Sequence, residues 1–158
     1  KNILVVITTA FVPTGGLTTV MMNYYRMMNK EEVKIDFAST NNPPQVLLDE
    51  IHASGSEYYQ LSDRKNVLAI FFALEEIMPG YDAIHVHANS AMAVMELQAA
   101  IWAGIKIRII HNHSSRSQHN LLNQLFLSLY RRSFTQAVAC SDEAGEWLYG
   151  KNGFITFA

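Results

Sequence analysis

Hydrophobic positions along the chain follow two different periods. Continuous aliphatic runs such as residues 3–8 are typical of strands buried on both faces of a parallel sheet. Between these runs, apolar residues recur at helical spacing, as in residues 17–28. The pattern predicts seven strands, at residues 3–8, 33–39, 57–61, 81–87, 106–111, 136–140 and 154–157. It predicts six helices, at residues 17–28, 45–53, 66–78, 91–103, 121–134 and 142–147.

The predicted strands and helices alternate from one end of the chain to the other. This order indicates βαβ units, because parallel strands must be joined by crossover connections. We therefore predict an α/β fold, a Rossmann-like doubly wound parallel sheet in a three-layer α/β/α arrangement. The 158 residues suit one domain, and the breaker at residues 41–44 is interpreted as a loop within it.

Composition narrows the classes of function. Apolar residues make up 49% of the chain, which indicates a packed core rather than a disordered segment. The formal net charge of -2 excludes the overall basic surface of a nonspecific nucleic-acid binder, so no nucleic-acid partner is expected. The single cysteine, Cys140, excludes an internal disulfide framework.

The sequence also carries hints about location. No segment has the pattern of a signal peptide, and no apolar run approaches the roughly 18 residues of a membrane-spanning helix. We expect a cytoplasmic protein. The Arg131-Arg132 pair, which follows the apolar residues 121–130, is the candidate for a peripheral contact at the inner face of a membrane.

The loop after the first predicted strand ends in Gly15-Gly16 at the start of a helix. Glycines there let backbone N–H groups approach an anion such as phosphate. The alternative is a βα turn that needs positive φ, and the sequence leaves both interpretations open. Neither a G-x-G-x-x-G nor a P-loop pattern is present.

The strand at residues 81–87 ends in His85 and His87, which share one face because side chains two apart on a strand point the same way. Such a pair can ligate zinc, but no carboxylate or cysteine lies near it in the sequence. We therefore expect no metal site, with His87 at the rim as the site residue. Asn89 and Ser90 follow it, and Ser90 is predicted to cap the next helix.

Nine consecutive polar residues, 111–119, separate an apolar strand from an apolar helix. A plain connection does not need so many hydroxyl, amide, imidazole and guanidinium groups. Because the run holds no Asp or Glu, it favours an anionic or polyhydroxylated ligand over a cation. We therefore interpret it as a binding loop.

Four segments together resemble the N-terminal domain of family-four retaining glycosyltransferases of GT-B architecture, of the type that builds bacterial capsule or exopolysaccharide. Gly15-Gly16-Leu17 is similar to the early glycine pair of that family. Residues 82–87, Asp-Ala-Ile-His-Val-His, look like its Y-D-hydrophobic-H-x-H strand. Residues 108–114, Arg-Ile-Ile-His-Asn-His-Ser, and residues 139–150, which begin Ala-Cys-Ser-Asp, resemble two further family signatures.

The resemblance implies roles for particular residues. In such enzymes two Rossmann-like domains face each other across a cleft, the N-terminal one taking the acceptor and the C-terminal one the nucleotide-sugar donor. By resemblance, Gly15 and Gly16 contact the donor diphosphate, and His113 is the catalytic histidine beside the transferred sugar. The residues implied on the acceptor or sugar side are His87, Asn89, Ser90, Ser114 and Arg116.

The implied reaction transfers a hexose from a nucleotide-diphosphate sugar to a hydroxyl of a sugar or lipid-linked saccharide, with retained configuration. The donor is a substrate, and no cofactor is obligatory. The family's C-terminal donor domain is absent from this sequence, whose final residue we expect to be a boundary rather than a natural end. Residues 1–158 are therefore expected to form a single acceptor-side domain that is inactive alone.

Other classes remain as alternatives. A dinucleotide-binding oxidoreductase domain would suit the fold but not the missing G-x-G-x-x-G pattern. A sugar-nucleotide 2-epimerase would call for acidic groups that the histidine loops lack. A non-catalytic α/β ligand-binding module is compatible with the length.

Overall fold

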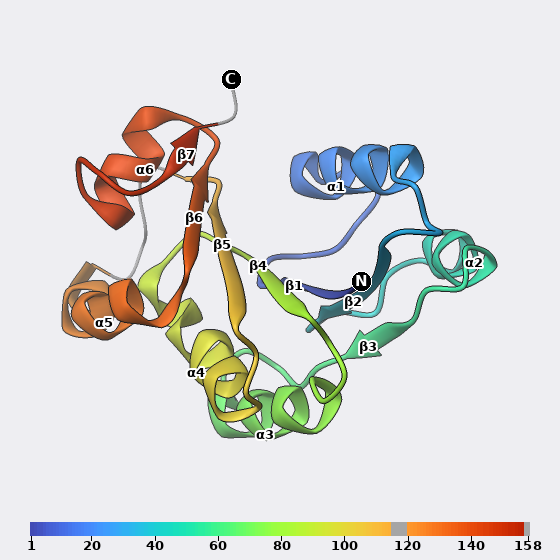
Figure 1. Ribbon diagram of the computed structural model, residues 1–158, viewed down its shortest axis with the longest axis horizontal. Helices are drawn as coiled ribbons and strands as arrows, with labels where there is room; N and C mark the ends of the chain where they lie inside the picture. Colours follow the sequence, from blue (N-terminus) through green and yellow to red (C-terminus); the bar gives the residue numbers. More distant parts are fainter. Residues whose placement is uncertain (115–119, 157–158) are drawn as a thin grey trace.

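The computed structural model describes residues 1–114 and 120–156. Its seven strands form one all-parallel sheet in the order β3-β2-β1-β4-β5-β6-β7 (Figure 1). The strands are β1 (Asn2–Ile7), β2 (Lys34–Ser39), β3 (Tyr58–Gln60), β4 (Ala83–Ala88), β5 (Ile107–Asn112), β6 (Gln136–Ala139) and β7 (Ile155–Thr156). The helices are α1 (Gly16–Met27), α2 (Gln45–Ala53), α3 (Val67–Ile77), α4 (Val94–Trp102), α5 (Asn120–Ser133) and α6 (Asp142–Tyr149).

The predicted Rossmann-like architecture is confirmed, including the seven strands, the six helices and the all-parallel sheet. One helix begins differently. Residues 91–103 were predicted as one helix, but the segment opens with the short 3₁₀ turn η1 (Ala91–Ala93) before α4. The predicted cap is present, since the Ser90 hydroxyl accepts a hydrogen bond from the Met92 N–H at 3.3 Å. That bond reaches only two residues ahead, which suits a tight turn.

The strand order places the helices on two faces of the sheet. From β1 the chain winds outward to β2 and β3, then returns to β4 and winds the other way. Because crossovers are right-handed, α1 and α2 lie on one face and α3 and α4 on the other, as Figure 1 shows. The core therefore divides into two clusters of buried side chains.

The two faces differ in what covers them. On the face that we call the closed face, strand residues such as Leu4, Ile84 and Ile110 are buried in one apolar cluster with residues of α3 to α6. On the other, the open face, Val5 and Ile7 pack with residues of α1 and α2 around β1 and β2. The strand register places His85 beside Val5, so the imidazoles of β4 belong to the open face.

Helix α1 covers the open face only in part. Met22 and Tyr25 are buried against the core, whereas Val20 and Tyr24 are 47% and 56% exposed. The apolar positions that predict this helix are therefore split between a packed side and an uncovered side. The uncovered side borders a cavity above β4 and β5.

In the two described ranges, none of the helices combines the length and the apolar character that crossing a membrane requires.

Candidate functional site

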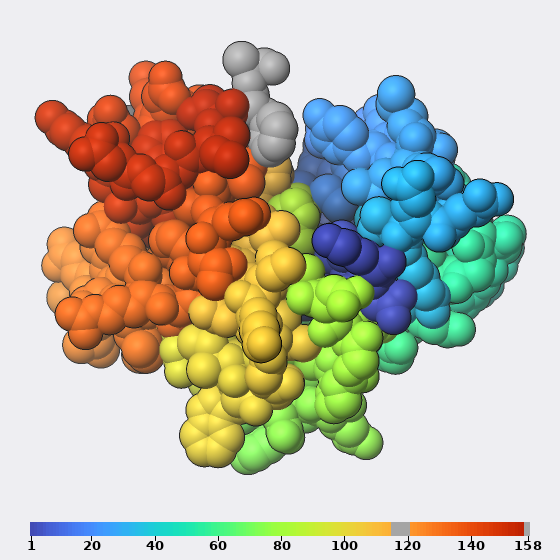
Figure 2. Space-filling model, in the orientation of Figure 1, coloured from blue at the N-terminus to red at the C-terminus, as the bar shows by residue number. Residues whose placement is uncertain are grey.

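A cavity of about 540 Å³ lies between α1 and the open face of the sheet. Figure 2 shows the surface hollowed between the blue segment that holds α1 and the red segment of α6 and β7. The cavity walls are mainly apolar side chains from β1, β2 and α1. Its polar lining consists of Gly16 at the start of α1, Cys140, and the imidazoles of His85, His87, His111 and His113.

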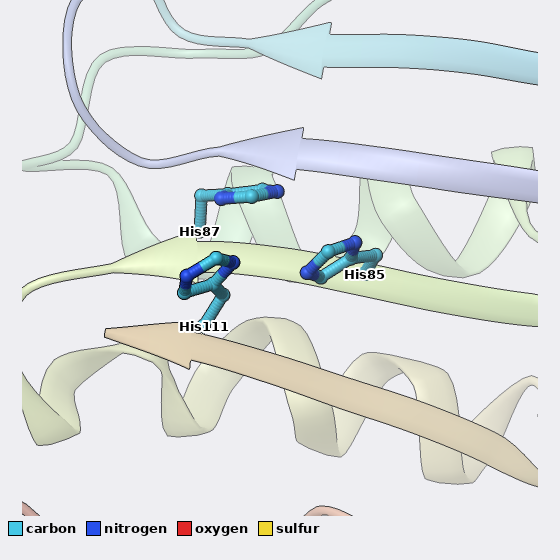
Figure 3. A group of neighbouring side chains, drawn as sticks. All are labelled: His85, His87 and His111. Atoms are coloured by element: carbon cyan, nitrogen blue, oxygen red, sulfur yellow. The ribbon is translucent and has the colours of Figure 1, made fainter. Parts of the chain in front are cut away.

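The four histidines come from the carboxyl ends of two neighbouring strands. His85 and His87 point from β4 to the same side, and His87 lies in register with His111 of β5 (Figure 3). His113 follows β5 two residues later. Ring centroids lie 4.2 Å apart for His85–His87, 5.0 Å for His87–His111 and 4.2 Å for His111–His113.

Burial keeps these imidazoles neutral. Loss of hydration disfavours the charged form and lowers the pKa of His85 and of His113 to about 4 and that of His111 to about 3. The pKa of His87, which is 1% exposed, falls well below its ordinary value for the same reason. At neutral pH each ring therefore has one N–H group that can donate and one nitrogen that can accept a hydrogen bond or bind a metal ion.

One of these bonds joins two of the predicted site residues. The Nδ1 atom of His87 lies 2.8 Å from the Nε2 atom of His113, a hydrogen-bond distance. The buried Nε2 atoms of His85 and His87, by contrast, have no hydrogen-bond partner among residues 1–114 and 120–156. Buried polar atoms are rarely left without a partner, so these two mark a place for a ligand.

The glycine pair at the start of α1 has no conformational need for glycine. Positive φ angles occur at other glycines of the described chain, and Gly15, the N-cap residue, has φ -76°. A Cβ at Gly15 would approach the Val12 carbonyl oxygen to 3.2 Å, whereas one at Gly16 would meet nothing within 4 Å. The turn interpretation that depends on positive φ is therefore excluded, and Gly16 leaves open space toward the cavity.

The first turn of α1 is suited to an anion. No side chain caps its N-terminus, and no acidic residue lies in its first turn. The leading N–H groups of a helix lack intrahelical acceptors and carry partial positive charge. Gly16, at the start of α1, lines the same cavity as His113, so these N–H groups lie at that cavity.

Asn112 holds the start of the polar loop in place. Its fully buried amide donates to the carbonyl oxygens of Ser114 and Ala144 at 2.8 and 2.7 Å, which ties the end of β5 to α6. The Ser114 N–H donates back to its Oδ1 at 3.3 Å. The predicted site residue Ser114 is thus fixed beside His113, while Arg116 lies outside the described residues.

A second cavity, of about 620 Å³, lies beyond the carboxyl ends of β1 and β4 on the side of α3 and α4. The predicted residues Asn89 and Ser90 line it, so the chain directs them away from His87 and His113. Arg64, Lys65 and Glu96 line it as well.

Two side chains of the second cavity each have an oxygen atom with no hydrogen-bond partner among the described residues. Glu96 is 1% exposed and forms an ion pair with Arg64 through Oε1. Within the part of the chain that the structure describes, the buried Glu96 Oε2 and Asn89 Oδ1 atoms have no hydrogen-bond partner. Both are acceptors, so they suit a ligand that carries hydroxyl or amine hydrogens.

The structure brings together Gly16, His87 and His113, three residues that the sequence places in different loops. Sequence reasoning included His111 and Asn112 in the predicted binding loop but gave neither a role of its own. It missed His85 as part of this site, and Arg64 and Glu96 as parts of the second cavity. The repeated H-x-H spacing at the ends of consecutive predicted strands was a usable signal for His111. No comparable signal pairs Arg64 with Glu96, which lie 32 residues apart.

Comparisons with known proteins give the family. The sequence profile described as Glycosyltransferase Family 4 matches residues 14–154. The chain is 29% identical over 150 residues to the Bacillus subtilis (strain 168) protein named "Putative glycosyltransferase EpsF", a match that covers 87% of this chain and 38% of that protein.

Solved structures share the fold. Anabaena Alr3699/HepE in complex with UDP matches with a TM-score of 0.67 and 16% identity, over 97% of this chain and 41% of that one. Acinetobacter baumannii MurG matches with a TM-score of 0.59 and 14% identity, over 88% and 40%. This chain thus spans about two fifths of the length of these relatives. The family match favours a transferase over the oxidoreductase and binding-module alternatives, and the chain belongs to glycosyltransferase family 4.

Proposed function

We propose that this chain is the N-terminal, acceptor-side half of a retaining glycosyltransferase, which transfers a hexose from a nucleotide-diphosphate sugar to a hydroxyl group. One observation carries the proposal. The uncapped N-terminus of α1, with open space at Gly16, shares a cavity with His113 at the end of β5. In open α/β sheets this carboxyl edge is where ligands bind.

The N-terminus of α1 is the proposed contact for the donor diphosphate. Departure of the nucleotide diphosphate leaves negative charge, which free N–H groups and the helix dipole stabilise. Gly15 and Gly16 let that backbone approach the phosphate oxygens. The similarity to HepE, whose structures hold UDP and UDP-glucose, supports a nucleotide-sugar donor.

His113 is the proposed catalytic residue beside the transferred sugar. Its ring is held by the hydrogen bond with His87 and by the adjacent Asn112 bonds, so it offers a fixed polar group at the cavity. A neutral imidazole can accept a hydrogen bond from a sugar hydroxyl or donate one to it. In this proposal His113 orients the sugar and stabilises the charge that develops on the sugar ring in the transition state.

The second cavity is the proposed acceptor site. Asn89 Oδ1 and Glu96 Oε2 provide acceptor atoms for sugar hydroxyls, and Ser90 lies beside them. Lys65, on the same wall, suits a phosphate of a lipid-linked saccharide. We place the reaction in the synthesis of capsule, exopolysaccharide or glycolipid, at the cytoplasmic face of a membrane, because the sequence motifs resemble enzymes of that kind.

The test compares the 158-residue chain with a longer protein that also contains the residues encoded after Ala158. The 158-residue chain should bind UDP-glucose weakly and release no glucose from it, since it supplies one wall of the site. The reading frame after Ala158 should encode a further βαβ domain of about 150–200 residues. In the longer protein, His113→Ala should abolish transfer. Enzyme-like turnover by the chain alone, or no such downstream domain, would contradict the half-site proposal.

A further inference from the structure

We propose that His85, His87 and His111 form a zinc-binding site on the open face of the sheet, with His113 as the hydrogen-bonded partner that orients His87. The proposal rests on the positions of the four side chains and does not depend on the transferase activity. From the sequence we expected no metal site, because no carboxylate or cysteine lies near His85 and His87 in the sequence.

The strand register supplies the third ligand. His85 and His87 share a face of β4, and His111 is the direct neighbour of His87 on β5. One nitrogen from each of the three rings lies within 4.8 Å of the other two. Tetrahedral zinc, with Zn–N bonds of about 2.0–2.1 Å, places its nitrogen ligands about 3.3–3.4 Å apart. Side-chain rotations that move these nitrogens by an ångström or so would close the set around one ion.

Two ring nitrogens of the proposed ligands lack a hydrogen-bond partner in the described chain. The Nε2 atoms of His85 and His87 are buried, and no hydrogen-bond partner for either lies in the described ranges. If His87 donates from Nδ1 to His113 Nε2, its own Nε2 carries a lone pair that faces no donor. A metal ion would accept that lone pair and remove the cost of leaving it buried.

The hydrogen bond between His87 and His113 resembles the contacts that support the ligands of a metal site. Metal-ligating imidazoles generally donate their second ring N–H to a neighbouring acceptor, which fixes the tautomer and the ring orientation. His113 Nε2 is placed to be that acceptor at 2.8 Å.

The donor atoms select the class of metal. All three proposed ligands are imidazole nitrogens, which suit zinc and other late first-row metals rather than the oxygen-seeking magnesium or calcium. Three protein ligands leave one tetrahedral position for water or an anion. The cavity along α1 gives an ion access to the site, since the three histidines line it.

Zinc binding by the untagged 158-residue chain is the test. Zn²⁺ is titrated in competition with a chromophoric chelator, and Co²⁺ is added separately to record its visible spectrum. We expect one ion per chain and the intense absorption of tetrahedral, nitrogen-ligated cobalt. Zn²⁺ should also raise the melting temperature, because it binds the folded state.

Variants assign the ligands. His85→Gln and His111→Gln should each lower zinc affinity by about 100-fold or more, because each removes a direct ligand. His113→Gln should lower it by about 10- to 100-fold, as for an outer-shell partner. The matched control His52→Gln changes an exposed histidine of α2 and should leave the affinity unchanged, and so should Cys140→Ser.

Three results would overturn the site: no zinc binding, zinc affinity that survives both His85→Gln and His111→Gln, or affinity lost in Cys140→Ser. If a ligand variant fails to fold, the cobalt spectrum of the unmodified chain decides, and the weak spectrum of octahedral aqueous cobalt counts against the site. None of these readouts involves a sugar nucleotide, so failure here leaves the transferase proposal standing.

Discussion

The two faces of one sheet are built from the same strands and have opposite character. On the closed face, β4 and β5 present Ile84, Val86 and Ile110 to an apolar core. On the open face the same strands present His85, His87 and His111 to a cavity. Side chains alternate along a strand, so a change of one position moves a residue from one environment to the other.

This difference locates the candidate site. Central strands of a parallel sheet are normally apolar on both faces, because helices cover both. Here the open face departs from that rule near the carboxyl ends of β4 and β5, where a cavity separates the histidines from α1. The apolar face maintains the fold, and the departure marks the candidate site.

The largest expected effect separates two neighbouring residues. Ile84→Ala removes a fully buried side chain from the closed face and should cost about 2–5 kcal/mol of unfolding free energy. His85→Ala, one position along, should cost less than about 1 kcal/mol, because it also removes a buried nitrogen that lacks a partner. Urea unfolding in the presence of EDTA measures both. Equal losses of unfolding free energy in the two variants would contradict the proposed difference between the closed and the open face.

A smaller loss is expected where the closed face supports the open one. Asn112→Ala breaks the buried bonds to Ser114 and Ala144 and should cost about 1–3 kcal/mol. It should also weaken binding of UDP-glucose, because the segment that carries His113 loses its anchor. Asn152→Ala, at an exposed position, is the control and should change neither quantity. Wild-type stability in the Asn112 variant would refute the anchoring role.

The smallest effect on stability is expected at the start of α1. Gly16→Ala meets no atom within 4 Å and should change the free energy of unfolding by no more than about 1 kcal/mol, with stabilisation favoured, because alanine is the better helix former. The added methyl group should still weaken UDP-glucose binding by blocking backbone approach. Urea unfolding curves measure the change in stability, and calorimetric titration measures the change in UDP-glucose binding.

Gly15→Ala is the comparison for that variant. Its methyl group would press on the Val12 carbonyl oxygen and the Thr18 hydroxyl, so stability should fall. If Gly16→Ala binds UDP-glucose as well as the unmodified chain, this glycine has no role at the donor phosphate.

The sequence was sufficient for the fold and for part of the site. Continuous runs such as residues 3–8 and helical spacing in residues 17–28 are local signals. They predicted the strands, the helices and the doubly wound fold class, but not the order of the strands in the sheet. The shared face of His85 and His87 was predictable from a spacing of two. The polar run at residues 111–119 was predicted as a binding loop, but the position of His111 directly beside His87 required the register between β4 and β5.

Other features depend on packing between distant segments. Asn89 and Ser90 follow His87 closely in sequence, yet they line a different cavity, because the chain turns into η1 on the closed side. The Arg64–Glu96 pair joins the turn before α3 to α4 through a side-chain contact that no local pattern encodes. The exposed side of α1 also eluded prediction, since its apolar spacing resembles that of a fully packed helix.

The open face, at the N-terminus of α1 and the end of β5, is the proposed donor half-site. Titration of UDP-glucose into the ¹⁵N-labelled chain in the presence of EDTA tests it directly. We expect saturable shifts of the Gly15, Gly16 and His113 amide signals, with those of α2 unchanged. Saturable shifts centred on α2, or none at either glycine or at His113, would contradict it.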